Sequence, residues 1–310
     1  MASGLVPTTP MEFDERTTLM DVHMFGAPHF GGIYLIDEER PTLIETGTSD
    51  SKGAILDALA QLRVDPSRVE NVIVTHIHLD HAGGAGFLLD ALSRAQVYVH
   101  ERGYPHLADP RRLLASATQA LGDAFSGYGT LQPIPEGRLE PLKGGEVLDL
   151  GGRELEIVYS PGHARHHVCI LDRSTRALYT GDSSGIYFPV DDRIIPTSPF
   201  PEFDLPTALE TMERLEALRP EALLYSHYGP YLDAGQMLRK QRREYERWGA
   251  KAAKLFAEMG LPEAVETVYE EWYANVTEFP RVFVQRIIAT NLMGFRRYFE
   301  RTRKDASGTG

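Results

Sequence analysis

The sequence has little of what would place it outside the ordinary globular proteins. A single cysteine in 310 residues excludes an internal disulfide, so nothing indicates an oxidising compartment. No run of 18 apolar residues is present, and a membrane-spanning helix would need one. Residues 1–10 lack the basic start and apolar stretch of a signal peptide. We therefore expect a cytoplasmic protein that folds without disulfides.

A surplus of positive charge is missing as well. The chain has 44 acidic and 32 basic residues, which gives a net charge of −12 with neutral histidine. Nucleic acids and anionic membranes bind basic patches, so we expect neither as a partner. With 42% hydrophobic and 25% charged residues, the composition is typical of a globular protein with a sizeable core.

The order of the predicted elements divides the chain in two. Residues 1–228 alternate between strands and helices, whereas helical periodicity dominates after Gly229-Pro230. The three helical segments are about Leu232–Met259, Glu263–Tyr273 and Arg281–Arg303. We predict an α/β domain over 1–228 and a helical C-terminal cap over 229–310. The cap would pack against the first domain or against a second copy of the chain in a homodimer.

The densest group of metal-binding side chains lies at residues 75–81, Thr-His-Ile-His-Leu-Asp-His. It directly follows an apolar strand predicted over 69–75. In an extended segment His76 and His78 point to the same side, so they can share one metal ion.

The chain must turn after this segment. Gly83-Gly84 follow, and we predict a helix from about Ala82 to Ser93. The turn would aim Asp80 and His81 away from the first ion and towards a second. Burying these groups without partners would be costly, so we interpret the segment as a metal site.

Three further candidate ligands each follow a predicted strand. His163 follows the strand over 154–159, Asp182 the strand over 177–180, and His227 the strand over 222–226. Reactive groups in open α/β sheets lie at strand ends. We therefore expect all the candidate ligands at one edge of one sheet.

This series of motifs resembles the metallo-β-lactamase superfamily. The resemblance covers about residues 20–228 and rests on His-Ile-His-Leu-Asp-His at 76–81, Ser-Pro-Gly-His at 160–163, Thr-Gly-Asp at 180–182 and Ser-His at 226–227. It implies an α/β (α+β) fold of the αββα type, in which two sheets pack face to face between helices. Here that sandwich would carry a C-terminal helical extension.

The resemblance also implies two divalent metal ions. His76, His78 and His163 would hold the first ion. Asp80, His81 and His227 would hold the second, and Asp182 would bridge both. This nitrogen and oxygen ligand set suits zinc, with iron or manganese as alternatives.

Two details refine the resemblance. Glu45 stands where the family usually has an aspartate that supports the ligands, so we expect a supporting role for Glu45 without specifying its hydrogen bond. A bridging Asp182 without any cysteine ligand looks like glyoxalase II and the lactonases rather than the class B β-lactamases. The helical extension would then shape the substrate pocket.

The implied chemistry is hydrolysis. Two ions about 3.5–4 Å apart activate a bridging hydroxide to attack a carbonyl or phosphorus. We predict a hydrolase acting on an ester-type bond (thioester, lactone or phosphotriester) of a small molecule. Asp80 is a candidate to orient the hydroxide or pass on its proton. Tyr187 is a candidate to line the pocket, with packing in the core as its alternative role.

An alternative function is a mononuclear iron oxidoreductase of the same fold, similar to the persulfide dioxygenases. One iron would leave Asp80, His81 and His227 without a metal, so metal stoichiometry separates the two functions. A binding module that has lost catalysis is disfavoured, because all seven candidate ligands are present.

Overall fold

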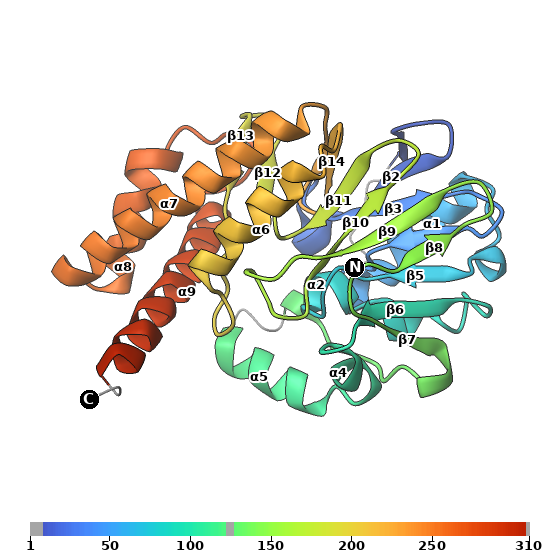
Figure 1. Cartoon of the computed structure of the whole chain (residues 1–310), viewed down its shortest axis with the longest axis horizontal. Coiled ribbons are helices and arrows are strands. Elements are labelled where there is room, and N and C mark those ends of the chain that lie inside the picture. Colours follow the sequence, from blue (N-terminus) through green and yellow to red (C-terminus); the bar gives the residue numbers. More distant parts are fainter. Residues whose placement is uncertain (1–8, 122–126, 308–310) are drawn as a thin grey trace, which may run out of the picture.

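The computed structural model describes residues 9–121 and 127–307. In this part of the chain two large sheets pack face to face, with helices along their outer sides (Figure 1). The first sheet has the strand order β1 (Met11–Glu12), β2 (Thr17–Asp21), β3 (Gly32–Ile36), β4 (Thr42–Ile44), β5 (Asn71–Ile73), β6 (Gln96–His100) and β7 (Leu139–Leu142). The second has the order β15 (Gly229–Tyr231), β14 (Ala222–Tyr225), β11 (Ala177–Gly181), β10 (Val168–Asp172), β9 (Glu154–Tyr159) and β8 (Val147–Asp149).

A separate two-stranded ribbon and the helices complete the fold. The ribbon pairs β12 (Ile186–Phe188) with β13 (Arg193–Ile195). The helices are α1 (Lys52–Gln61), α2 (Leu79–Ala82), α3 (Ala85–Leu88), α4 (Tyr104–Ala108), α5 (Arg111–Leu121), α6 (Leu205–Ala217), α7 (Ala234–Glu258), α8 (Leu261–Val268), a π-helical turn (Tyr269–Tyr273) and α9 (Arg281–Ser307).

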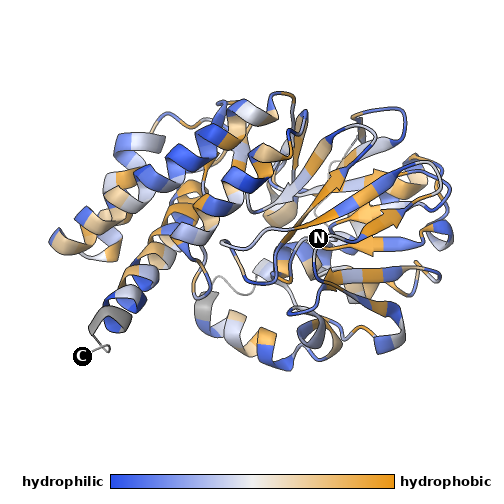
Figure 2. Ribbon diagram, in the orientation of Figure 1, coloured by the Kyte–Doolittle hydropathy of each residue, from blue (hydrophilic) through white to orange (hydrophobic). Residues whose placement is uncertain are grey.

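The sandwich follows from strands that are apolar on both faces. In β3, Tyr34 and Ile36 join the core between the sheets, while Ile33 and Leu35 join the core beneath the helices. Figure 2 shows the hydrophobic residues concentrated along the strands. A strand that is covered on both sides requires this pattern, because both of its faces are removed from water. The predicted αββα sandwich with C-terminal helices is confirmed.

The last strand and the first C-terminal helix meet at the expected division of the chain. β15 lies just beyond residue 228 and pairs antiparallel with β14, and α7 begins at Ala234. Asp233 caps α7 by accepting a hydrogen bond from the Gln236 N–H. α7 packs against α6 and α9, and its Trp248 is fully buried against Trp272, Tyr273 and Phe295. The division into 1–228 and 229–310 stays a prediction.

None of the helices over 9–121 and 127–307 has both the length and the apolar character needed to cross a membrane.

The predicted helix over 82–93 is wrong in its start and its length. A short helix, α2, begins at Leu79 and therefore already contains Asp80 and His81. A second, α3, ends at Leu88. The break falls at Gly83 and Gly84, whose backbones pass so close to neighbouring carbonyl oxygens that a Cβ on either would collide with them.

A buried ion cluster joins the two sheets at one end of the sandwich. Arg153, just before β9, donates hydrogen bonds at 2.8–3.0 Å to Asp14, Glu38 and Asp172. Its side chain is 8% exposed and that of Asp172 is 0% exposed. Burial opposes ionisation of Asp14, but the hydrogen bonds from Arg153 lower the pKa of Asp14 to about 2. The cluster lies before β9, and so at the opposite end of that strand from His163.

Candidate metal centre

The first group of converging side chains is His76, His78 and His163. His76 and His78 lie in the segment after β5, and His163 lies in the loop after β9. His76 Nε2 lies 2.8 Å from His78 Nδ1, and His163 Nε2 lies 3.0 Å from the same atom. The three nitrogens therefore point to one place, as the ligands of a single ion do.

The second group is Asp80, His81 and His227. The first two lie in α2, and His227 follows β14. His227 Nε2 lies 3.3 Å from His81 Nε2 and 3.7 Å from Asp80 Oδ2. These three side chains form another arrangement that could hold a metal ion.

Asp182, which follows β11, connects the two groups. Its Oδ2 lies 3.5 Å from His163 Nε2. Its Oδ1 lies 3.3 Å from His81 Nε2 and 3.6 Å from His227 Nε2. One carboxylate oxygen thus faces each group, which is the placement expected of a bridging ligand.

We predicted that the seven side chains lie at the edge of one sheet, and this prediction is wrong. β5 belongs to the seven-stranded sheet, whereas β9, β11 and β14 belong to the six-stranded sheet. The candidate ligands meet because both sheets present the ends of these strands at the same end of the sandwich.

Burial lowers the pKa of the three imidazoles of the first group, His76, His78 and His163. It lowers the pKa of His163 to about 3 and the pKa of His76 well below its ordinary value. For His81, burial is outweighed by the carboxylates of Glu45 and Asp182, which raise its pKa. For Asp182, burial is outweighed by His81 and His163, which hold its pKa well below its ordinary value.

The donor set fits divalent metal ions. Four imidazoles point Nε2 towards the centre, and Nδ1 of each lies 2.9–3.0 Å from an oxygen outside it. These oxygens are Thr75 Oγ1 for His76, Glu45 Oε1 for His81, Thr197 Oγ1 for His163 and the Phe30 carbonyl for His227. This pattern leaves the inward lone pairs free for a metal. Asp182 Oδ1 is buried and accepts no hydrogen bond from the described residues. A cation between the two groups would satisfy this oxygen.

Glu45 has the contacts of a supporting residue. Its Oε1 accepts hydrogen bonds from Thr75 Oγ1 at 2.5 Å and Ser226 Oγ at 3.1 Å, and it lies 3.0 Å from His81 Nδ1. Its Oε2 accepts from the Thr75 N–H at 3.3 Å. The backbone at Glu45 has φ of 70°, a left-handed conformation that costs a non-glycine residue about 1–2 kcal/mol. The four contacts hold the residue in this conformation.

The backbone N–H of Tyr187 donates to the His227 carbonyl, whereas the side chain of Tyr187 contacts other residues. Its ring packs against Tyr225 and Tyr231, and its hydroxyl donates to Asp192 at 3.4 Å. No contact with a candidate ligand involves its side chain among the described residues, so its catalytic role stays a prediction.

Tyr128 is a tyrosine whose pKa the candidate ligands raise, and we did not predict it. Burial raises its pKa first, and the carboxylates of Asp80 and Asp182 raise it further. Its ring packs edge-on against Phe25, at 4.8 Å between centroids. Tyr128 lies 32 residues before the next motif, which begins at Ser160, so no local pattern would have identified it.

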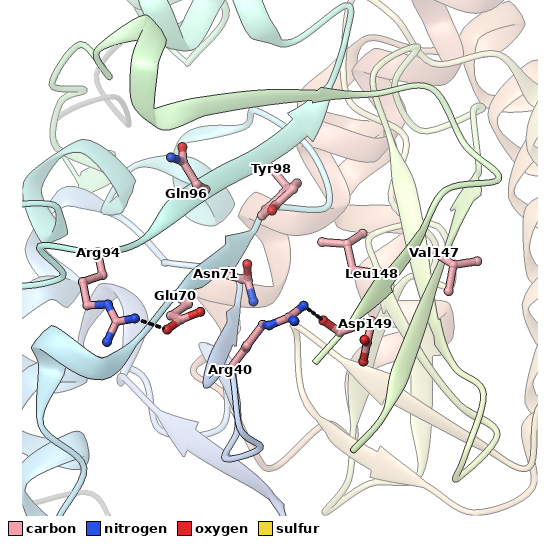
Figure 3. A pocket seen from close by; sticks show the side chains of 9 residues that line it. All are labelled: Arg40, Glu70, Asn71, Arg94, Gln96, Tyr98, Val147, Leu148 and Asp149. Atoms are coloured by element: carbon pink, nitrogen blue, oxygen red, sulfur yellow. Dashed lines mark hydrogen bonds and ion pairs between the residues drawn. The ribbon is translucent and has the colours of Figure 1, made fainter. Parts of the chain in front are cut away.

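A cavity of about 430 Å³ lies elsewhere in the molecule (Figure 3). It is lined by Arg40, Glu70, Asn71, Arg94, Gln96, Tyr98, Val147, Leu148 and Asp149. Asn71 and Gln96 are the first residues of β5 and β6, whereas His76 and His78 follow the last residue of β5. The cavity is therefore at the opposite end of the strands from the candidate metal centre.

Comparison with known proteins identifies the family. A model of the metallo-beta-lactamase superfamily matches residues 27–227. The chain belongs to the metallo-β-lactamase superfamily. A metallo-beta-lactamase fold-containing protein of Sulfurisphaera tokodaii, ST1585, is 31% identical over 231 residues, which cover 72% of this chain and 77% of that protein. The crystal structure of ST1585 matches with a TM-score of 0.70 at 24% identity, covering 91% of this chain and 99% of that one.

Some members of the superfamily that resemble this chain are thioesterases by name. The acyl-coenzyme A thioesterase MBLAC2 of Gallus gallus is 30% identical over 112 residues. This match covers 36% of the present chain and 40% of the thioesterase, so the chain spans less than half of that relative. Membership of the glyoxalase II and lactonase side of the superfamily stays a prediction.

Proposed function

We propose that this metallo-β-lactamase superfamily member is a dinuclear metal-dependent hydrolase that cleaves an ester-type bond of a small molecule. The observation that carries the proposal is the position of Asp182. One of its oxygens faces His163 of the first group, and the other faces His81 and His227 of the second. A single ion would need only one group and would leave the other without a function.

The two groups would hold one ion each, with Asp182 shared between them, and zinc is the ion that we expect. When bound, two such ions lower the pKa of water towards neutrality and polarise a carbonyl or phosphoryl oxygen. The side chains of Thr75, Glu45 and Thr197 keep the imidazoles in the tautomer that presents Nε2 inwards.

Asp80 is suited to the proton transfer. Its side chain is 17% exposed, whereas those of His81 and His227 are 0% and 2% exposed. Asp80 Oδ2 therefore borders the open side of the centre, where it could take a proton from water and pass it to solvent. An Asp80→Asn variant that keeps both metal ions and full turnover would refute this role.

A thioester is the substrate that the comparisons favour among the three ester-type candidates. The support is the partial match to an acyl-coenzyme A thioesterase. Tyr128, whose pKa the carboxylates of Asp80 and Asp182 raise, and Phe25, which packs on its ring, would offer a hydroxyl and an apolar surface to an acyl group.

The experiment combines metal analysis with a substrate panel. Protein reconstituted with zinc, iron or manganese is assayed with one thioester, one lactone and one phosphotriester, beside an Asp182→Ala control. Two bound ions and turnover that the control lacks would support the proposal. One bound iron without hydrolysis would instead support the persulfide-dioxygenase-like oxidoreductase. Two bound ions without turnover of any substrate would refute the ester-type assignment.

A further inference from the structure

The segment Pro196–Ser198, between β13 and α6, separates the candidate metal centre from the C-terminal helices. Thr197 is 6% exposed and Ser198 is fully buried. Neither residue stands in a motif, and Thr197 lies 34 residues after His163. The segment nevertheless contacts both a candidate ligand of the first group and the bridging Asp182.

The Thr197 hydroxyl joins these two ligands. Its Oγ1 donates to the Asp182 backbone carbonyl at 2.5 Å. Because a hydroxyl has a single proton, Oγ1 can only accept in its second contact, from His163 Nδ1–H at 3.0 Å. The proton of the neutral His163 therefore sits on Nδ1, and Nε2 keeps its lone pair directed towards His78 and Asp182. One hydroxyl thus fixes a tautomer and a backbone position together.

The C-terminal helices hold Thr197 in place from the other side. Tyr245, in α7, donates from its hydroxyl to the Thr197 carbonyl at 3.2 Å. Asn291, in α9, accepts from the Ser198 N–H at 2.7 Å through its Oδ1. One turn later, α9 approaches the segment so closely that a Cβ at Gly294 would collide with the Ser198 carbonyl. All of these contacts are buried, so water does not compete for them.

We propose that Thr197 is a positioning residue for His163 and Asp182, and that the C-terminal helices are part of the metal centre because Tyr245 holds Thr197 and Asn291 holds the adjacent Ser198. The proposal rests on the ligand set proposed above. It gives the helical extension a role that does not depend on contact with the substrate. Loss of such an outer contact lowers metal affinity by about 10- to 100-fold in other proteins.

The test compares Thr197→Val with Thr197→Ser. Valine keeps the shape and removes the hydroxyl, whereas serine keeps the hydroxyl and removes the methyl group. Zn²⁺ affinity is measured for both ions by competition with a chromophoric chelator, and the absorption spectrum of the Co²⁺-loaded protein reports the ligand geometry. We expect about a 10- to 100-fold loss of affinity and a changed spectrum for the valine variant, with both restored in the serine variant.

A second arm tests the helices. Tyr245→Phe removes one oxygen and leaves the ring stacked on Phe203, so it should weaken Zn²⁺ binding without unfolding the protein. The matched control is Tyr273→Phe, which removes a buried phenol of the helical extension that does not contact Thr197. If the valine variant fails to fold by circular dichroism, Thr197→Ala takes its place.

The outcomes separate this proposal from the proposed function. If the wild-type protein binds two ions and the valine variant binds them equally well, only the role of Thr197 is refuted. Equal losses in the valine and serine variants would also refute it, because packing rather than the hydroxyl would then matter. A Tyr245→Phe variant that binds like the wild type would refute the part played by α7. A wild-type protein that binds no metal would overturn both proposals.

Discussion

Replacing Glu45 by glutamine removes one negative charge from the support of the candidate metal centre and keeps the shape of the side chain. In the wild type the carboxylate accepts from Thr75 Oγ1, from the Thr75 N–H and from Ser226 Oγ, and it faces His81 Nδ1. An amide offers one oxygen and one NH2 group. If the oxygen takes the place of Oε1, the NH2 group faces the Thr75 N–H, and two donors then oppose each other.

The contacts that Glu45→Gln loses determine how much the substitution destabilises the protein and weakens metal binding. A buried N–H left without an acceptor costs about 1–3 kcal/mol, and replacing a charged acceptor by a neutral one weakens the bond to His81 by about 1 kcal/mol. The sum is about 2–4 kcal/mol. The first part destabilises the fold with or without metal. The second part weakens the orientation of His81 and should reduce metal affinity by about fivefold, since 1.4 kcal/mol corresponds to a factor of ten.

Urea unfolding in the presence of a chelator measures the first part, and the same titration with saturating zinc adds the second. A Glu45→Asp variant separates charge from reach, because it restores the charge on a side chain one methylene shorter. We expect it to lose part of the contacts to His81 and Thr75 although aspartate is the residue usual in the family. Unchanged unfolding midpoints for Glu45→Gln in both titrations would refute the assignment of Glu45 as a supporting residue.

Three further predictions follow from other contacts. Tyr128→Phe should lower kcat/KM by about tenfold through the loss of the hydrogen bond that its hydroxyl would donate to the substrate; an unchanged kcat/KM would contradict this role. Arg153→Met should destabilise the protein by about 3–5 kcal/mol in urea unfolding, because it leaves buried carboxylates unpaired. The folded pKa of Asp14 is about 2, below its ordinary value of 3.8, so ionised Asp14 stabilises the folded state above pH 3.8 and this stabilisation is lost as pH falls towards 2. This loss should be absent from the Arg153→Met variant. An identical dependence of unfolding on acid in the two proteins would contradict the role of the pair. Free zinc at 100 times its dissociation constant should stabilise the folded state by about 2.7 kcal/mol in thermal unfolding, and a variant lacking Asp182 should show a smaller gain; no shift in the wild type would argue against a metal site.

The sequence by itself determined which side chains could form a metal centre. Imidazole and carboxylate groups spaced as in His76, His78 and Asp80, directly after an apolar strand, leave few interpretations other than a metal site. His163, Asp182 and His227 could be found in the same way, since each follows a strand that the hydrophobic pattern indicates. These signals are local, and local signals survive in a sequence without an alignment. Their function as ligands remains our proposal.

The tertiary structure decided how these side chains meet and what holds them. Strand pairing is not local, so the sequence did not show that β5 lies in one sheet and β9, β11 and β14 in the other. It also did not place Tyr128 near Asp80 or Tyr187 against Asp192. Two of the four groups that orient the imidazoles are a backbone carbonyl at Phe30 and a hydroxyl at Thr197, which are too common to be recognised in a sequence. Such groups acquire a role only when folding brings them to a ligand 34 or 197 residues away.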